Sequence, residues 1–194
     1  MRDKRTLEMN LIALFIAIIV AMAFIPQVGF IAYGGVAITT LHIPVIIGAI
    51  HGGRKFGAIL GLAFGVFSLI VAYTMPRGPG DFIFQNPVIA IVPRLMFGVA
   101  AYYIFIGFRR FISHKTAAIA LTFIFATLAH SVFTLSFMVL FADQIETTFG
   151  QLYQFLLGIV SINGALETIG AALIGTPIVT RLLASNSLSL EEVS

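Results

Sequence analysis

Long apolar segments with almost no charge recur along the chain, and they restrict its fold more than any other feature. The stretch NLIALFIAIIVAMAFI, residues 10–25, has no charged residue, and neither has the stretch from residue 116 to 141. About 18 consecutive apolar residues are enough for a helix that crosses a bilayer. Only 10% of the residues are charged, whereas a soluble domain has about 25%. The sequence therefore predicts an integral membrane protein.

Six apolar segments, separated by short polar or glycine-rich loops, predict an all-α integral membrane protein built as a six-transmembrane-helix bundle. Residues 1–183 are expected to form this single membrane domain, and the polar residues 184–194 a disordered cytoplasmic tail. The predicted spans are residues 7–25, 40–50, 56–73, 86–108, 116–141 and 152–183.

The positions of the basic residues predict which side of the membrane each loop faces. Nine of the 11 lysines and arginines lie in four places. These are the residues before the first predicted span, the loops after the second and fourth spans, and the end of the sixth span. The remaining loops contain only Arg77, and Arg94 lies within a span. Because lysine and arginine favour cytoplasmic loops, we expect both termini inside the cell, which is the N-in/C-in topology.

Small residues recur every four positions in two of the predicted spans. Such stripes let membrane helices approach closely, because lipid gives apolar side chains no preference for protein. The glycines of residues 53–65 predict a contact within the bundle. The alanines at 13, 17 and 21 fit either a bundle contact or a docking face for another membrane protein.

Polar side chains inside the spans are costly in a bilayer and mark function unless they have a structural partner. At about 1.5 Å per residue, Arg94 lies about 12 Å below the outer surface, and His130 and Asn163 about 17 Å. These three are predicted to line one outward-facing cavity. Glu167 comes out deeper, at about 23 Å, so an ion pair with Arg94 is the weaker explanation of both charges. A neutral buried His130 and a protonated, structural Glu167 are the alternatives.

Arg94 requires an acceptor, because a guanidinium stays charged at any physiological pH. An anionic ligand group or a helix carbonyl would serve. Asn86 lies two turns earlier on the same face of the predicted helix, while Thr127 and Thr134 share a face with His130. These two faces are the predicted binding surface.

Several chemistries have no support in the sequence. There is no GxxxxGK[ST] phosphate loop, no HExxH motif and no cysteine. The histidines form no metal-ligand cluster, and no nucleophile with its base is evident. We therefore expect no metal, no cofactor, no nucleic-acid partner and no enzymatic activity. A membrane enzyme using Glu167 and His130 and a self-sufficient small carrier remain as alternatives.

Nearly the whole chain resembles the substrate-binding S-components of energy-coupling factor (ECF) vitamin transporters. The resemblance rests on ALFIAIIVA, LHIPVIIGAIHGGRKFGAILGLAFG, NPVIAIVPRLMFG and INGALETIGAALIGTPIV taken together. It implies a multi-pass protein of a prokaryotic plasma membrane that captures a small-molecule vitamin from outside. It also implies docking on a membrane scaffold (EcfT-like) subunit with two ATPase subunits, which hydrolyse the ATP. The family's docking surface corresponds to Ala13, Ala17 and Ala21.

The same resemblance points to the ligand and to the loops that cover it. The elements HIPVIIGAI, PRLMFG and NGxxE are most similar to the pantothenate-type branch, and a membrane arginine suits the carboxylate of pantothenate. Hydroxymethylpyrimidine, pyridoxine, folate and riboflavin are the alternative ligands. The loops 27–40 and 75–85 are expected to form a lid. The expected ligand-binding residues are Arg94, Asn86, His130, Asn163, Thr127, Glu167, Tyr33 and His42.

Overall fold

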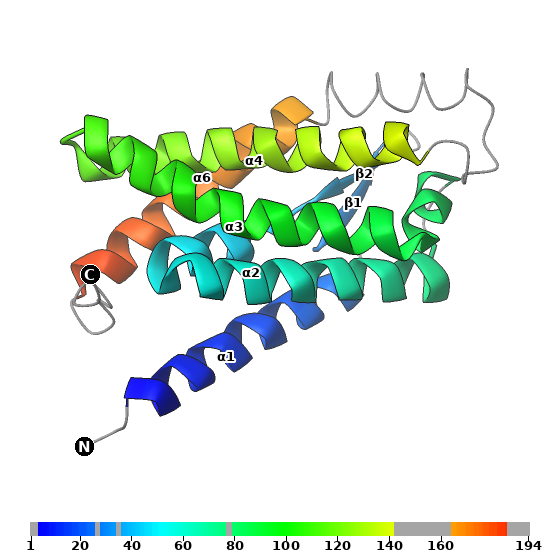
Figure 1. Ribbon diagram of the computed structural model, residues 1–194, viewed down its shortest axis with the longest axis horizontal. Coiled ribbons are helices and arrows are strands. Elements are labelled where there is room, and N and C mark those ends of the chain that lie inside the picture. The colour runs from blue at the N-terminus through cyan, green and yellow to red at the C-terminus, as the bar shows by residue number, and fades with distance from the viewer. Residues whose placement is uncertain (1–3, 26–27, 34–35, 77–78, 142–163, 186–194) are drawn as a thin grey trace.

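Helices long enough to cross a membrane dominate the structure, a computed structural model that describes residues 4–25, 28–33, 36–76, 79–141 and 164–185. Within those ranges, five helices have the length and apolar composition of membrane spans. They lie alongside one another, with a short 3-10 helix at one end of the bundle and a small hairpin beside the helices (Figure 1). The elements are α1 (Lys4–Phe24), β1 (Phe30–Tyr33), β2 (Val36–Thr39), α2 (His42–Thr74), η1 (Pro79–Gln85), α3 (Pro87–Phe111), α4 (Lys115–Leu140) and α6 (Gly164–Ala184).

Three of the predicted spans, 7–25, 86–108 and 116–141, agree with helix bounds to within three residues. The predicted spans 86–108 and 116–141 correspond to α3 and α4. Asn86 caps α3, because its side-chain oxygen accepts a hydrogen bond from the backbone N–H of Val88 at 2.9 Å. The predicted span 152–183 is described only from Gly164 onwards. The predicted tail falls outside the described residues beyond Ser185.

Helix α2 consists of two helical limbs that meet at Gly53. This glycine has φ 80°, a left-handed conformation that breaks the helix and favours glycine. The limbs then pack on each other: a Cβ at Gly57 would lie 3.0 Å from Cβ of Ala49, and one at Gly48 would collide with Leu60. The limbs occupy the positions of the two predicted spans 40–50 and 56–73, and Gly53 supplies the reversal between them.

The glycine stripe of the second limb faces α3, which confirms that it packs within the bundle. A Cβ at Gly57 would lie 2.1 Å from the carbonyl oxygen of Gly98, and one at Gly61 would lie 2.3 Å from that of Arg94. A Cβ at Gly65 would meet the Cα atom of Ile91 at 2.7 Å. These backbones therefore touch directly, and α2 makes its most extensive contact with α3.

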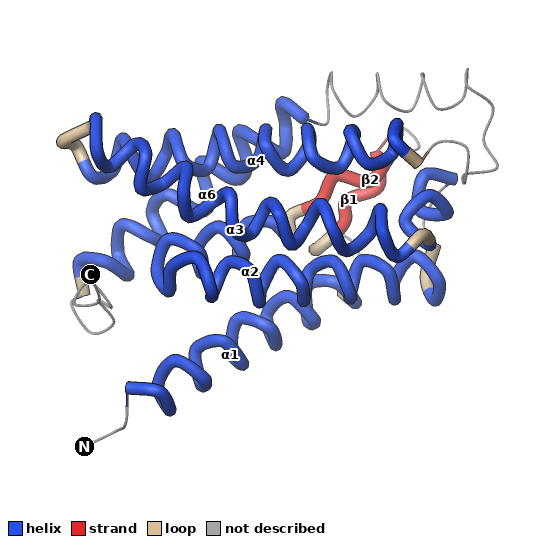
Figure 2. Tube along the Cα trace, in the orientation of Figure 1, coloured by secondary structure: helices blue, strands red, loops and turns tan. Residues whose placement is uncertain are grey.

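A two-stranded hairpin lies in the loop between α1 and α2, where the sequence predicted part of a lid. Phe30 pairs with Thr39 and Tyr33 with Val36 in antiparallel register. The ladder continues through the backbone N–H of Thr40, which donates to Gly29 at 2.9 Å. A Gly-Gly pair between two short runs of β-formers is a hairpin signal, but the runs are only four residues long and fall between two strong helices. Strand β2 contacts α6 (Figure 2).

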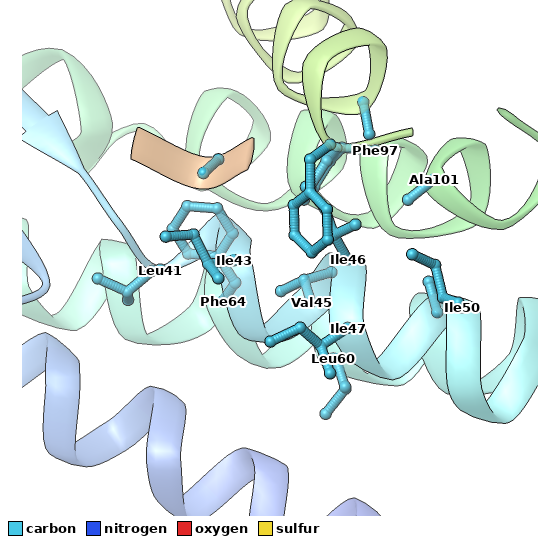
Figure 3. Packing of buried hydrophobic residues seen from close by; sticks show 14 of the residues in the cluster. Leu41, Ile43, Val45, Ile46, Ile47, Ile50, Leu60, Phe64, Phe97 and Ala101 are labelled. Carbon is cyan, nitrogen blue, oxygen red and sulfur yellow. The ribbon is translucent and has the colours of Figure 1, made fainter. Parts of the chain in front are cut away.

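The helix ends and turns that the structure describes lie at the two ends of the bundle. The beginning of α1, the end of α6 and the turn from α3 to α4 lie at one end in Figure 1, while η1 lies at the other. The packed core joins α2 to α3, α4 and α6, and includes Ile46 and Leu60 from the two limbs of α2 with Phe97 from α3 (Figure 3). Helix α1 adds mainly Ile19 and Ala23 to this core and is otherwise largely uncovered.

Candidate functional site

The side chain of Arg94 is buried and held by its own helix. It is 4% exposed, and its Nη1 atom donates to the carbonyl oxygen of Ile89 at 2.8 Å. This carbonyl would normally accept from the backbone N–H of residue 93, four positions on. Residue 93 is a proline, which has no N–H. Pro93 thus leaves the Ile89 carbonyl available, and the guanidinium takes it.

Two aromatic rings frame the guanidinium. Its central carbon lies 4.5 Å from the ring centre of Phe84 and 5.6 Å from that of Phe64, within the range of cation–π attraction. Its Nε atom is buried and has no hydrogen-bond partner. Among the described residues, no carboxylate oxygen comes within 4.0 Å of Arg94. Within the described part of the chain, the charge is therefore stabilised by rings and one carbonyl, without a counterion in contact.

Two histidines stack on each other next to the same rings. The ring centres of His42 and His130 are 5.8 Å apart and the planes differ by 11°. His130 also lies 5.0 Å from Phe97 and 5.4 Å from Phe64, measured between ring centres. Within the part of the chain that the structure describes, both ring nitrogens of His42 and Nδ1 of His130 are buried without a hydrogen-bond partner. The backbone of Thr39 lies near the His42 ring.

Helix α4 adds two threonine hydroxyls on the face that carries His130. The hydroxyls of Thr127 and Thr134 are buried and have no partner within the described chain. By contrast, the hydroxyls of Ser131 and Ser136 donate to carbonyls of their own helix. Buried polar groups are normally hydrogen-bonded, so a gathering of unpartnered ones beside a buried cation indicates a binding site for a polar, anionic ligand.

Glu167 is engaged with the hairpin and not with Arg94. Its Oε1 atom accepts from the backbone N–H of Thr39 at 2.6 Å. The two charges act on each other electrostatically, but their atoms form no ion pair within 4.0 Å. This agrees with the sequence interpretation that a direct pair is the weaker account.

The remaining predicted residues have different positions. Asn86 is at the N-cap of α3, two turns from Arg94. Tyr33 ends strand β1, and its side chain is outside what the structure describes, as is the whole of Asn163. Ala13, Ala17 and Ala21 are all exposed on α1.

Sequence reasoning missed the three phenylalanines that surround the charged and polar groups. Phe64, Phe84 and Phe97 come from α2, η1 and α3, and apolar residues in a membrane protein give no signal of their own. Pro93 did give a signal: a proline inside a helix releases a carbonyl four residues earlier. An arginine directly after it is well placed to use that carbonyl.

Other candidate sites are weaker within the described residues. No group of three or more histidine, aspartate or glutamate residues is arranged to hold a metal ion. A pocket of about 660 Å³ lies on the outer face of α3, against Phe133 of α4, and is lined almost entirely by hydrocarbon. It includes none of the predicted site residues, and Met96 and Tyr103 in its wall are exposed, as expected of a surface that faces lipid.

Comparisons with known proteins show the family of the chain. A family model for the substrate-specific component of ECF transporters matches residues 8–179. The chain is 30% identical over 183 residues to the pantothenate transporter PanT of Leuconostoc mesenteroides, covering 87% of this chain and 88% of that protein. It is 31% identical over 198 residues to the pantothenic acid transporter PanT of Lactococcus lactis, covering 94% and 96% respectively.

Proposed function

Because the chain belongs to the family of substrate-specific components of ECF transporters, we propose that it captures pantothenate outside the cell for import. The family is one of transport proteins, so the chain is a membrane-embedded transport component and not itself an enzyme. Both similar proteins are named as pantothenate transporters. The vitamin, the residues that bind it and the partner subunits are the parts that we propose.

The observation that carries the proposal is the buried guanidinium of Arg94, which no carboxylate of the described residues contacts. A charge in such a place needs a counterion, and a ligand carboxylate binds a guanidinium through two parallel, charge-assisted hydrogen bonds. Pantothenate carries one carboxylate. We therefore assign its carboxylate to Arg94.

The uncharged part of the proposed site suits the rest of the same molecule. Pantothenate has an amide and two hydroxyl groups, which both donate and accept hydrogen bonds. His42, Thr127, His130 and Thr134 offer unpartnered atoms of both kinds. The rings of His42 and His130 stack on each other, so they leave no slot between them for a flat ring such as that of riboflavin.

Calorimetric titration of the purified chain tests the binding residue. Arg94→Ala should weaken pantothenate binding tenfold or more, which is about 1.4 kcal/mol, while the protein stays folded. Arg110→Ala removes an exposed arginine from the same helix and should change nothing. Wild-type protein should discriminate against pantothenol, which has a hydroxymethyl group in place of the carboxylate, and Arg94→Ala should lose this preference. Equal affinity of wild type and Arg94→Ala would make the arginine structural.

The same titration separates the alternative ligands. Hydroxymethylpyrimidine, pyridoxine, folate and riboflavin should all bind more weakly than pantothenate. If one of these four binds more tightly than pantothenate, it takes the place of pantothenate in the proposal, and the proposed binding site stays the same. If none of the five ligands binds, the proposed capture function is wrong.

Delivery into the cell is proposed to need partners. We propose a membrane scaffold subunit and two ATPase subunits, as the family implies, because the sequence has no nucleotide-binding motif of its own. Uptake measured in cells that make this chain with and without those subunits tests the point. Vitamin uptake by the chain alone would favour the alternative of a self-sufficient carrier.

A further inference from the structure

Glu167 bonds to a backbone N–H of β2 that points away from the partner strand of the hairpin. In antiparallel pairing, hydrogen-bonded and non-hydrogen-bonded residue pairs alternate. Thr40 is bonded to Gly29 across the ladder, so the neighbouring pair of Thr39 and Phe30 is a non-bonded one. The N–H of Thr39 therefore points away from β1, and the carboxylate of Glu167 receives it at 2.6 Å.

Thr39 passes this attachment on to the start of α2. Its hydroxyl donates to the carbonyl of Gly29 at 3.4 Å and accepts from the backbone N–H of Leu41 at 3.3 Å. Leu41 is fully buried, and His42 follows it directly. The strand end, the turn into α2 and the imidazole of His42 are thus connected to α6 through one carboxylate.

We propose that Glu167 is a positioning residue, whose carboxylate anchors the hairpin to α6 and thereby places His42 against His130. The hairpin occupies one of its two carboxylate oxygens, and in this proposal Glu167 acts on a ligand through His42. The role in ligand binding rests on the proposed vitamin capture, whereas the anchoring itself does not.

Amide hydrogen exchange, resolved by residue with NMR and without ligand, tests the anchor first. In the wild-type protein, the Thr39 amide should exchange at least tenfold more slowly than that of Ala37, the other outward-pointing amide of β2 by the same alternation. Glu167→Ala should remove this difference and Glu167→Gln should largely keep it, because an amide oxygen still accepts. Equal exchange at Thr39 and Ala37 in the wild type overturns the anchor, whether or not any vitamin binds.

A matched variant controls for local damage to α6. The hydroxyl of Thr168 donates to Gly164 within the same helix, so Thr168→Val perturbs this turn but not the hairpin. It should leave the Thr39 amide protected. Faster exchange at Thr39 in both Thr168→Val and Glu167→Ala would assign the effect to the helix and overturn the proposal.

Ligand kinetics then distinguish positioning from direct contact. Glu167→Ala should speed pantothenate dissociation tenfold or more, keep the preference for pantothenate over pantothenol, and be rescued by Glu167→Gln. A changed preference between these two ligands would mean that Glu167 contacts the ligand, which contradicts the proposal. If wild-type protein binds no vitamin while Thr39 is protected, the proposed function fails and the anchor stands.

Discussion

At the scale of single residues, Pro93 and Arg94 act together. A proline inside a transmembrane helix leaves a carbonyl unsatisfied, and in lipid such a group is costly unless something else bonds to it. The guanidinium of Arg94 reaches back five residues to that carbonyl of Ile89. The bond fixes the guanidinium beside Phe84 and Phe64, with its remaining donors available to a ligand.

Pro93→Ala tests this coupling. The alanine N–H would take the Ile89 carbonyl, so the helix should gain stability, by up to about 3 kcal/mol on peptide scales. The guanidinium would lose its fixed support, and pantothenate affinity should fall about fivefold, or about 1 kcal/mol. Thermal unfolding in detergent and calorimetric titration measure the two effects. Higher stability with unchanged affinity would show that Ile89 does not position the arginine.

At the scale of elements, the glycine stripe of α2 sets where Arg94 lies. Without side chains at Gly57 and Gly61, the second limb of α2 lies directly on the α3 backbone, and the carbonyl of Arg94 itself is part of that contact. The Phe64 ring, on the same limb, is thereby brought to the guanidinium. In the proposed function, helix packing and ligand recognition therefore share these residues.

Gly61→Ala should therefore damage both packing and binding. Its Cβ would lie 2.3 Å from the Arg94 carbonyl oxygen, and overpacking of this kind costs about 1–3 kcal/mol. We expect a lower unfolding temperature and at least about threefold weaker pantothenate binding, or about 0.7 kcal/mol. Gly107→Ala on α3 is the matched control, because no atom lies within 4 Å of its added Cβ. Equal effects of the two changes would refute a special role of the stripe.

The helices could be predicted from the sequence because each carries its own signal of length and hydropathy. Arg94, His130 and Thr127 were found for a similar reason: a polar residue in an apolar span is conspicuous. The contact between Glu167 and Thr39 could not be predicted, since the two residues are 128 positions apart and the hairpin between the helices was not foreseen. Depth counted along separate helices also says nothing about which side chains face one another.

At the scale of the whole molecule, the basic residues at the described ends give a topology that can be measured. Lys4, Arg109 and Arg181 lie at the end of the bundle opposite η1 (Figure 1), so the positive-inside rule leads us to propose that η1 faces outward. The chain has no cysteine, so single cysteines can report position without a background.

Phe82→Cys and Ser113→Cys test this topology. Phe82 is exposed on η1, and Ser113 is exposed in the turn between α3 and α4. A membrane-impermeant maleimide should label Phe82→Cys in intact cells, and Ser113→Cys only after the cells are broken. The reverse pattern would place η1 in the cytoplasm and contradict capture from outside.

Helix α1 is the element best placed for an interaction between whole molecules. Its main packing contact is with α2, and its three regularly spaced alanines are exposed. Exposed alanines leave a smooth surface on which another membrane helix can approach closely. We propose that this face, defined by Ala13, Ala17 and Ala21, docks on the scaffold subunit.

Ala17→Trp tests the docking face, because a large ring there would keep a partner helix at a distance. Uptake of labelled pantothenate by cells that contain the full set of subunits should fall to background, whereas the affinity of the purified variant should stay at the wild-type value. Ile18→Trp changes an exposed side chain that is already large, 39% exposed and about 100° around the helix from Ala17, and should keep most of the uptake. Loss of vitamin binding in Ala17→Trp, with assembly of the subunits intact, would show that the alanines serve the ligand site and not the partner.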